Sequence, residues 1–111
     1  MIDAHHIPQD YQSLLMHQEA VRMIQSNPAL TDRLLATLAR WDTHASARSK
    51  PLRERWVRII QEHDWALATE ESERGNQLRQ ASPMATLLPT SVRLGIIRHI
   101  RKLKDQQHAS I

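Results

Sequence analysis

The chain contains no cysteine and no phenylalanine, and its 111 residues include only two glycines and one tyrosine. Without cysteine it can form neither a disulfide nor a thiolate metal site, and it has no thiol nucleophile. Two glycines leave few positions for the tight turns that join the strands of a hairpin. The remaining apolar residues are mostly Leu, Ile and Ala, which suit helices better than strands. These features predict an all-α protein.

Long apolar runs are missing as well. No run approaches the roughly 18 residues needed to cross a bilayer. The N-terminal stretch MIDAHHIPQD lacks the basic and apolar parts of a signal peptide. We therefore expect a cytoplasmic protein with no membrane partner. The length suits one compact domain.

Proline and capping residues divide the chain into a compact bundle of five or six helices with short joints. The helical pattern starts at Asp10, and Asn27-Pro28 caps and opens a second helix. A polar surface loop at 43–50 precedes a third helix, which Ser49 and Pro51 open. Short elements follow over 64–89, and Pro89-Thr90-Ser91 begins the last helix. We expect a single domain over 10–104, with flexible tails at 1–9 and 105–111.

Two sets of apolar residues predict what the bundle buries. The three tryptophans at 41, 56 and 65 are expected in the core or at its edge, because large aromatics dominate packing. The segment 74–89, RGNQLRQASPMATLLP, is expected to form a joint with its turn set by Ser82-Pro83. Its apolar side chains should pack on the core: Leu78, Ala81, Met84, Leu87 and Leu88.

Seven histidines invite a metal or catalytic interpretation, but their spacing does not favour one. No pair of histidine and carboxylate residues at helical spacing stands beside further ligands, so we expect no metal and no cofactor. Arg58 with His63 and Arg93 with His99 have the loose spacing of HEPN-type ribonuclease motifs. A cation and an imidazole one or two turns apart can hold a phosphate and move a proton. The polar residue that normally follows the arginine is missing, and we predict a protein that is not an enzyme.

The last helix is the basic end of the chain. The stretch 91–104, SVRLGIIRHIRKLK, has cations but no acid beside an apolar stripe. Such a helix can bind nucleic-acid phosphates or an acidic partner, or lie on a membrane surface. Its cations can equally be a solvated face with no partner. In that case they stabilise the helix, because positive charges near the C-terminus interact favourably with the helix dipole. The candidate residues for a nucleic acid or an acidic partner are Arg93, Arg98, Arg101, Lys102 and Lys104.

Two stretches resemble a group of small bacterial helical proteins. One is LRQASPMATLLPTSVRLGIIR (78–98), in which a Leu-Arg-Gln-x-Ser-Pro-x-Ala segment precedes a leucine and a basic final helix. The other is SLLMHQEAVRMIQSNPAL (13–30), where a helix with His and Arg meets an Asn-Pro joint. The resemblance covers roughly 13–98. Two features depart from the group: no fused DNA-binding domain is present, and Met84 stands where a bulky aromatic is common.

Members of that group are regarded as antitoxins of toxin–antitoxin pairs, so the resemblance implies a bacterial protein that binds and neutralises a toxin. The residues of the joint supply candidates for this contact, because 72–81 has too few apolar residues for a buried helix. We expect these side chains on the outside: Arg74, Asn76, Gln77, Arg79 and Gln80. The alternative function is a nucleic-acid-binding regulatory protein that uses its basic last helix.

Overall fold

The computed structural model describes the backbone of residues 7–109 and the side chains of residues 9–106. Within this part of the chain all regular structure is helical, so the all-α prediction is confirmed. The elements in chain order are α1 (Ile7–Ser26), α2 (Leu30–Asp42), η1 (Ala47–Ser49), α3 (Lys50–Glu62), α4 (Trp65–Ala68), α5 (Glu73–Arg79), η2 (Met84–Leu87) and α6 (Thr90–Ala109). The two η elements are single 3₁₀ turns.

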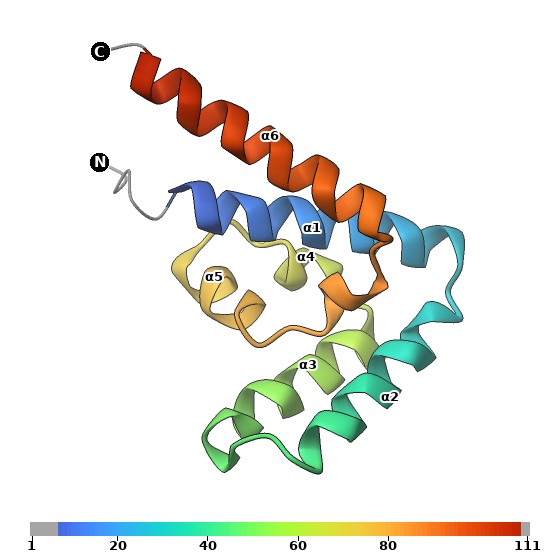
Figure 1. Ribbon diagram of the computed structural model, residues 1–111. Helices are drawn as coiled ribbons and strands as arrows, with labels where there is room; N and C mark the ends of the chain where they lie inside the picture. Colours follow the sequence, from blue (N-terminus) through green and yellow to red (C-terminus); the bar gives the residue numbers. More distant parts are fainter. Residues whose placement is uncertain (1–6, 110–111) are drawn as a thin grey trace.

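Two pairs of longer helices frame the molecule (Figure 1). α6 lies along one side of α1, and α2 pairs with α3 at the other end. The short elements α4, α5 and η2 fill the space between the two pairs. η2 contacts both α1 and α2, and α5 contacts α1, so the segment 74–89 connects the two halves of the bundle.

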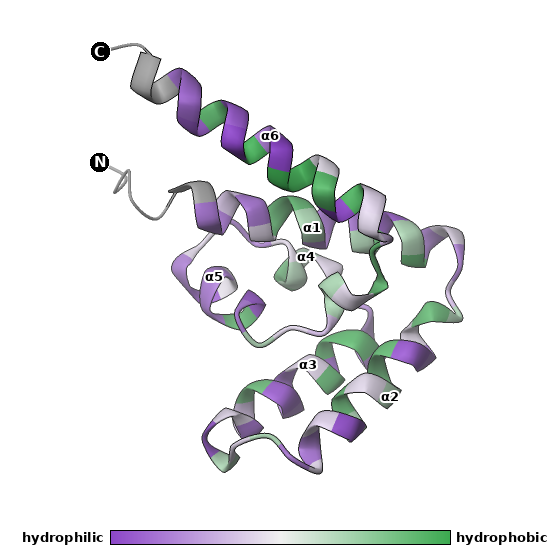
Figure 2. Cartoon of the chain, viewed as in Figure 1, coloured by the Kyte–Doolittle hydropathy of each residue, from purple (hydrophilic) through white to green (hydrophobic). Residues whose placement is uncertain are grey.

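The core lies where these elements converge. Trp56, Leu34, Leu38, Ile60 and Met84 are its largest fully buried side chains. Figure 2 shows the hydrophobic segments of α2 and α3 where the two helices approach each other, whereas the outer half of α6 is mostly hydrophilic.

The prediction for the tryptophans is confirmed. Trp56 is fully buried in α3, and Trp41 and Trp65 are partly buried and pack against the core. The indole nitrogen of Trp56 donates a hydrogen bond of 2.7 Å to the carbonyl oxygen of Leu78. This bond satisfies the one polar atom that the burial of Trp56 would otherwise leave unpaired.

Several predicted boundaries differ from the structure. α1 begins at Ile7 rather than at Asp10, and α6 continues to Ala109 rather than ending near 104. Parts of both predicted tails are therefore helical, and the remaining tail residues, 1–6 and 110–111, lie outside the described part of the chain. Asn27 and Pro28 do not cap and open α2. They form a turn in which the Asn27 carbonyl accepts from the amide of Leu30, where the helix begins.

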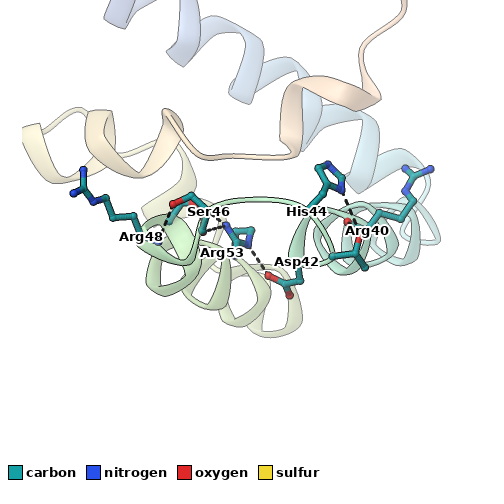
Figure 3. Close-up of polar contacts among 8 residues, drawn as sticks. Arg40, Asp42, His44, Ser46, Arg48 and Arg53 are labelled. Atoms are coloured by element: carbon teal, nitrogen blue, oxygen red, sulfur yellow. Dashed lines mark hydrogen bonds and ion pairs between the residues drawn. The ribbon is translucent and has the colours of Figure 1, made fainter.

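The loop between α2 and α3 is held by a buried arginine (Figure 3). Arg53 donates from Nε to Asp42 Oδ1 over 2.5 Å and from Nη1 to the carbonyl of Ser46 and the hydroxyl of Ser49. Its side chain is only 5% exposed. Ser46 accepts from the amide of Arg48 and opens the 3₁₀ turn η1. The predicted surface loop is therefore an ordered connection pinned to α3.

Candidate interaction site at the elbow of residues 74–89

The segment 74–89, called the elbow below, contains α5, the Ser82-Pro83 turn and η2. Ser72 caps α5, with its hydroxyl accepting from the amide of Gly75 over 3.0 Å. Gly75 lies directly against the preceding turn, since a Cβ placed there would be 2.2 Å from the Glu70 carbonyl oxygen. The glycine therefore permits the close return of α5 onto residues 68–70.

The inner side of the elbow packs as predicted. The hydroxyl of Ser82 accepts from the amide of Met84 over 3.0 Å, so this serine sets the turn that leads into η2. Of the five apolar residues predicted to face the core, four are buried and Ala81 is partly exposed. The buried four are Leu78, Met84, Leu87 and Leu88.

The outer side of the elbow is only partly as predicted. Arg74, Gln77 and Gln80 are exposed, and Asn76 is partly buried. Arg79, which we expected on the outside, is buried with 5% of its surface exposed. The expectation was wrong for Arg79 because two of its hydrogen-bond acceptors are the carbonyl oxygens of Ala68 and Glu70, which the local sequence of α5 does not reveal.

Arg79 ties α5 to the end of α4. Its Nη1 donates to the carbonyl oxygens of Ala68 and Glu70, at 3.2 and 2.9 Å, and its Nη2 donates to Asn76 Oδ1 at 2.6 Å. The Nε atom is buried and has no hydrogen-bond partner. Burial lowers the pKa of the guanidinium, while the charges of Asp10, Glu71 and Glu70 act in the opposite direction.

Arg74 and Glu70 form an ion pair on the exterior of the elbow. The Arg74 guanidinium donates to both carboxylate oxygens of Glu70, at 3.0 and 2.6 Å. Hydrogen bonds from Arg74 and then from the Ser72 hydroxyl lower the pKa of Glu70 from 4.5 to about 2. Arg74 is therefore presented at a fixed place, and its side chain remains 60% exposed.

His17 on α1 completes the site and was not among the predicted site residues. Its Nδ1 lies 2.7 Å from the carbonyl oxygen of Ser13, and its Nε2 lies 2.7 Å from the hydroxyl of Ser82. The Nδ1 nitrogen must donate to the carbonyl, so Nε2 accepts from Ser82. The imidazole also packs beside the indole of Trp56, with ring centroids 5.8 Å apart.

Burial keeps His17 uncharged. The pKa of His17 falls from 6.5 to about 4, chiefly because burial removes water from the charged form; the positive charge of Arg79 adds to the shift. One sequence feature did mark this residue: His17 stands between Leu14 and Val21 at helical spacing, on the apolar face of α1. A histidine on such a face is expected to be buried and hydrogen-bonded.

A cavity of about 500 Å³ opens between α1 and the elbow. Its inner wall includes His17, Ser82 and Arg79, and Gln80 lies on the outer wall together with α1 residues such as Gln12. A second cavity of about 320 Å³ lies on the other side of Asn76, beside Tyr11 and Glu73. Asp10, Asn76 and Arg79 line both cavities, so two of the predicted contact residues are shared by the two cavities.

The predicted basic surface of α6 is exposed. Its five cations have exposed side chains, and none forms an ion pair with another residue of the described chain. Among the apolar residues of the helix, Ile100 is buried, while Leu94 is 43% exposed. α6 therefore combines an inward apolar stripe with exposed cations that have no ion-pair partner among the described side chains.

The two ribonuclease-like pairs are not joined in the described structure. Arg58 lies 3.9 Å from Glu62 in an exposed ion pair, and the ring of His63 stacks on Trp65 with centroids 5.5 Å apart. His63 also has a left-handed backbone at the end of α3. Neither Arg58 with His63 nor Arg93 with His99 shares a hydrogen bond.

Among the described side chains, no group of three or more histidine, aspartate or glutamate residues is arranged to hold a metal ion. None of the helices described between residues 7 and 109 is both long and apolar enough to span a membrane.

No protein-family profile, curated protein sequence or solved structure matches this chain. The resemblance to bacterial antitoxins therefore stays a prediction that rests on the motifs at 13–30 and 78–98.

Proposed function

We propose that this protein is a non-enzymatic interaction module that uses the outer side of the elbow to bind a protein partner. The observation that carries the proposal is the exposure of Arg74, Gln77 and Gln80 on a segment whose inner side is fixed to the core. Hydrogen bonds from Trp56 to Leu78 and between Ser82 and His17 hold the backbone beneath them. A polar surface on a fixed backbone loses little backbone freedom on binding.

The specific role that we propose is the antitoxin of a bacterial toxin–antitoxin pair, located in the cytoplasm. This role rests on the resemblance of segments 13–30 and 78–98 to antitoxin-like proteins. In such a role the elbow would cover the toxin's active site or substrate groove through contact area and complementary charge. The partner would therefore be a toxin encoded beside this protein.

Co-expression with the toxin candidate encoded by a neighbouring gene tests the proposal. The protein should restore growth, and a triple alanine variant at Arg74, Gln77 and Gln80 should lose that protection while keeping its helical circular-dichroism spectrum. A matched control replaces three exposed residues away from the elbow, Arg33, Gln61 and Gln25, with alanine. Protection by the elbow variant equal to that by the control would show that the elbow is not the contact surface. Unchanged toxicity with the wild-type protein would end the antitoxin proposal.

The exposed cations of α6 favour a second candidate function, nucleic-acid binding. A protein that neutralises phosphates releases counterions, so its affinity falls steeply as salt rises. Gel shifts with DNA and RNA over a salt series should show this dependence if α6 binds phosphates. Arg98→Gln with Arg101→Gln should flatten the salt slope, whereas Arg33→Gln should leave it unchanged. A lack of binding at low salt would remove this candidate.

A further inference from the structure

Two arginines of the described chain are buried, and they have different partners. Arg53 is 4% exposed, and its Nε donates to the Asp42 carboxylate. Arg79 is 5% exposed, yet no carboxylate of the described residues lies within ion-pair distance and its Nε has no hydrogen-bond partner. A buried cation with an unsatisfied donor is costly, which makes Arg79 the least satisfied charged group of the described core.

The unsatisfied donor lies on the edge of the guanidinium that carboxylates prefer. Nε–H and one Nη2–H point in the same direction and together form the fork that binds both oxygens of a carboxylate. In Arg79 the other nitrogen, Nη1, is already held by the carbonyls of Ala68 and Glu70. On the Nε/Nη2 edge only Nη2 is engaged, and its partner is the neutral amide oxygen of Asn76. One donor of this edge, Nη2, therefore has a partner, and the other, Nε, has none.

Asn76 is the residue that engages the Nη2 half of this edge. It is partly exposed, and its second polar contact is a long hydrogen bond of 3.3 Å from Nδ2 to Asp10 Oδ2. Both Asn76 and Arg79 line the cavity of about 500 Å³ between α1 and the elbow. Rotation of the Asn76 side chain into solvent would free the Nη2 donor beside the unpartnered Nε, on a residue that lines this cavity. The volume is ample for a carboxylate together with the carbons that carry it.

We propose that the Nε/Nη2 edge of Arg79 is a carboxylate-binding site, entered through the cavity between α1 and the elbow when Asn76 turns away. The ligand is a carboxylate that supplies the counter-charge present at Arg53 and absent at Arg79. The proposed function provides its source, a partner protein that inserts an Asp or Glu side chain or its C-terminal carboxylate; the existence of the site does not depend on that source.

The surrounding charges determine how tightly the site binds. Asp10 lines the cavity and would repel an incoming carboxylate. Glu70 is engaged by Arg74 and Ser72, and Glu71 is exposed to solvent, where its charge is screened. His17 on the inner wall is uncharged at neutral pH. Asp10 is therefore the main unfavourable charge, and its removal should strengthen binding.

A titration with acetate tests the site without any partner. In ¹⁵N-edited NMR spectra of the full chain, the Nε–H resonance of Arg79 should shift and saturate as acetate replaces chloride at constant ionic strength. The Nε–H resonance of Arg53 should not move, because its carboxylate is already in place. Asn76→Ala and Asp10→Asn should each tighten acetate binding several-fold, on the order of 1 kcal/mol or less at a rim position. Gln61→Ala, at an exposed position of α3 away from the elbow, should leave it unchanged.

Two results would overturn the site. One is an Arg79 resonance that responds to acetate no more than to chloride in both the wild type and Asn76→Ala. The other is equal acetate affinity in Arg79→Lys, which lacks the fork, with binding in both proteins followed through the backbone amides of the residues that line the cavity. Peptides identify the source: competition by an amidated peptide containing glutamate indicates a side chain, and competition only by a free C-terminus indicates the chain end. Because acetate needs no partner, failure here and failure of toxin neutralisation are separate outcomes.

Discussion

His17 Nε2 and Ser82 Oγ lie 2.7 Å apart, although 65 residues separate them in the sequence. The bond joins the middle of α1 to the turn that sets the direction of the elbow. Ser82 accepts at the same time from the amide of Met84, so its hydroxyl serves the local turn and the long-range contact together. Ser82 therefore links α1 to the elbow at the point where the chain turns into η2.

Ser82→Ala should destabilise the protein by about 1–3 kcal/mol, because it leaves the buried Nε2 of His17 and the amide of Met84 without a partner. Urea denaturation measures the free energy of unfolding. Ser91→Ala is the control, since Ser91 is exposed at the start of α6 and its loss should cost no more than about 0.5 kcal/mol. Equal costs for the two variants would contradict the proposed double role of Ser82.

His17 should make the stability depend on pH. Its pKa in the folded state, about 4, lies below the 6.5 expected in the unfolded chain. Between these values the unfolded state binds the proton and the folded state does not, so stability falls as the pH drops from 6.5 toward 4. The total loss is about 3 kcal/mol by linkage.

The measurement for His17 is the free energy of unfolding across that pH range, in the wild type and in His17→Gln. The wild type should lose more stability on acidification than the variant, because the carboxylates contribute to both proteins alike. Parallel pH profiles for the two proteins would show that folding does not lower the pKa of His17, so that His17 becomes charged in the folded state over the same pH range as in the unfolded chain.

The two glycines should respond to alanine with opposite signs. At Gly75 an added Cβ would meet the Glu70 carbonyl at 2.2 Å, so Gly75→Ala should displace α5 and destabilise the protein by about 1–3 kcal/mol. At Gly95 nothing lies within 4 Å of the position that a Cβ would occupy, so Gly95→Ala should stabilise α6 by up to about 1 kcal/mol. Thermal unfolding curves show whether each substitution raises or lowers the stability. A stabilising Gly75→Ala would contradict the described contact with residue 70.

Trp56→Phe should cost about 2–4 kcal/mol, because it leaves a cavity in the core and removes the donor to the Leu78 carbonyl. Trp65→Phe is a matched control on a partly exposed side chain and should cost less. Both variants keep two tryptophans, so fluorescence-detected urea unfolding can follow each of them. A smaller loss at position 56 than at position 65 would contradict the central place of Trp56.

The sequence allowed prediction of the features that depend on neighbouring residues. The helices, the Ser82-Pro83 turn and the burial of Leu78 and Met84 follow from spacing and capping over a few positions. The same reasoning predicted that Pro28 opens α2, and this was wrong. The Asn27 carbonyl instead accepts from the amide of Leu30 in a turn, and α2 begins at Leu30.

The features that the sequence did not reveal depend on distant partners. Arg79 is buried because carbonyls from the end of α4 and the following turn surround it, and the sequence of α5 alone favoured an exposed side chain. The bond between His17 and Ser82 likewise requires knowing that α1 packs against the elbow. The exposure of Arg98, Arg101 and Lys102 was predictable, since helical periodicity places them away from the apolar stripe. The exposure of Arg93 did not follow from it, because Arg93 lies seven residues before the buried Ile100.

Because α6 packs mainly against α1, its docking can be lost without opening the rest of the core. Amide protons in the outer part of α6 should therefore exchange with deuterium through local fraying, whereas those of α3 around Trp56 should exchange only when the whole bundle opens. A ligand that lies along α6 would then protect amides far from the core, and this pattern would separate it from a ligand bound at the elbow.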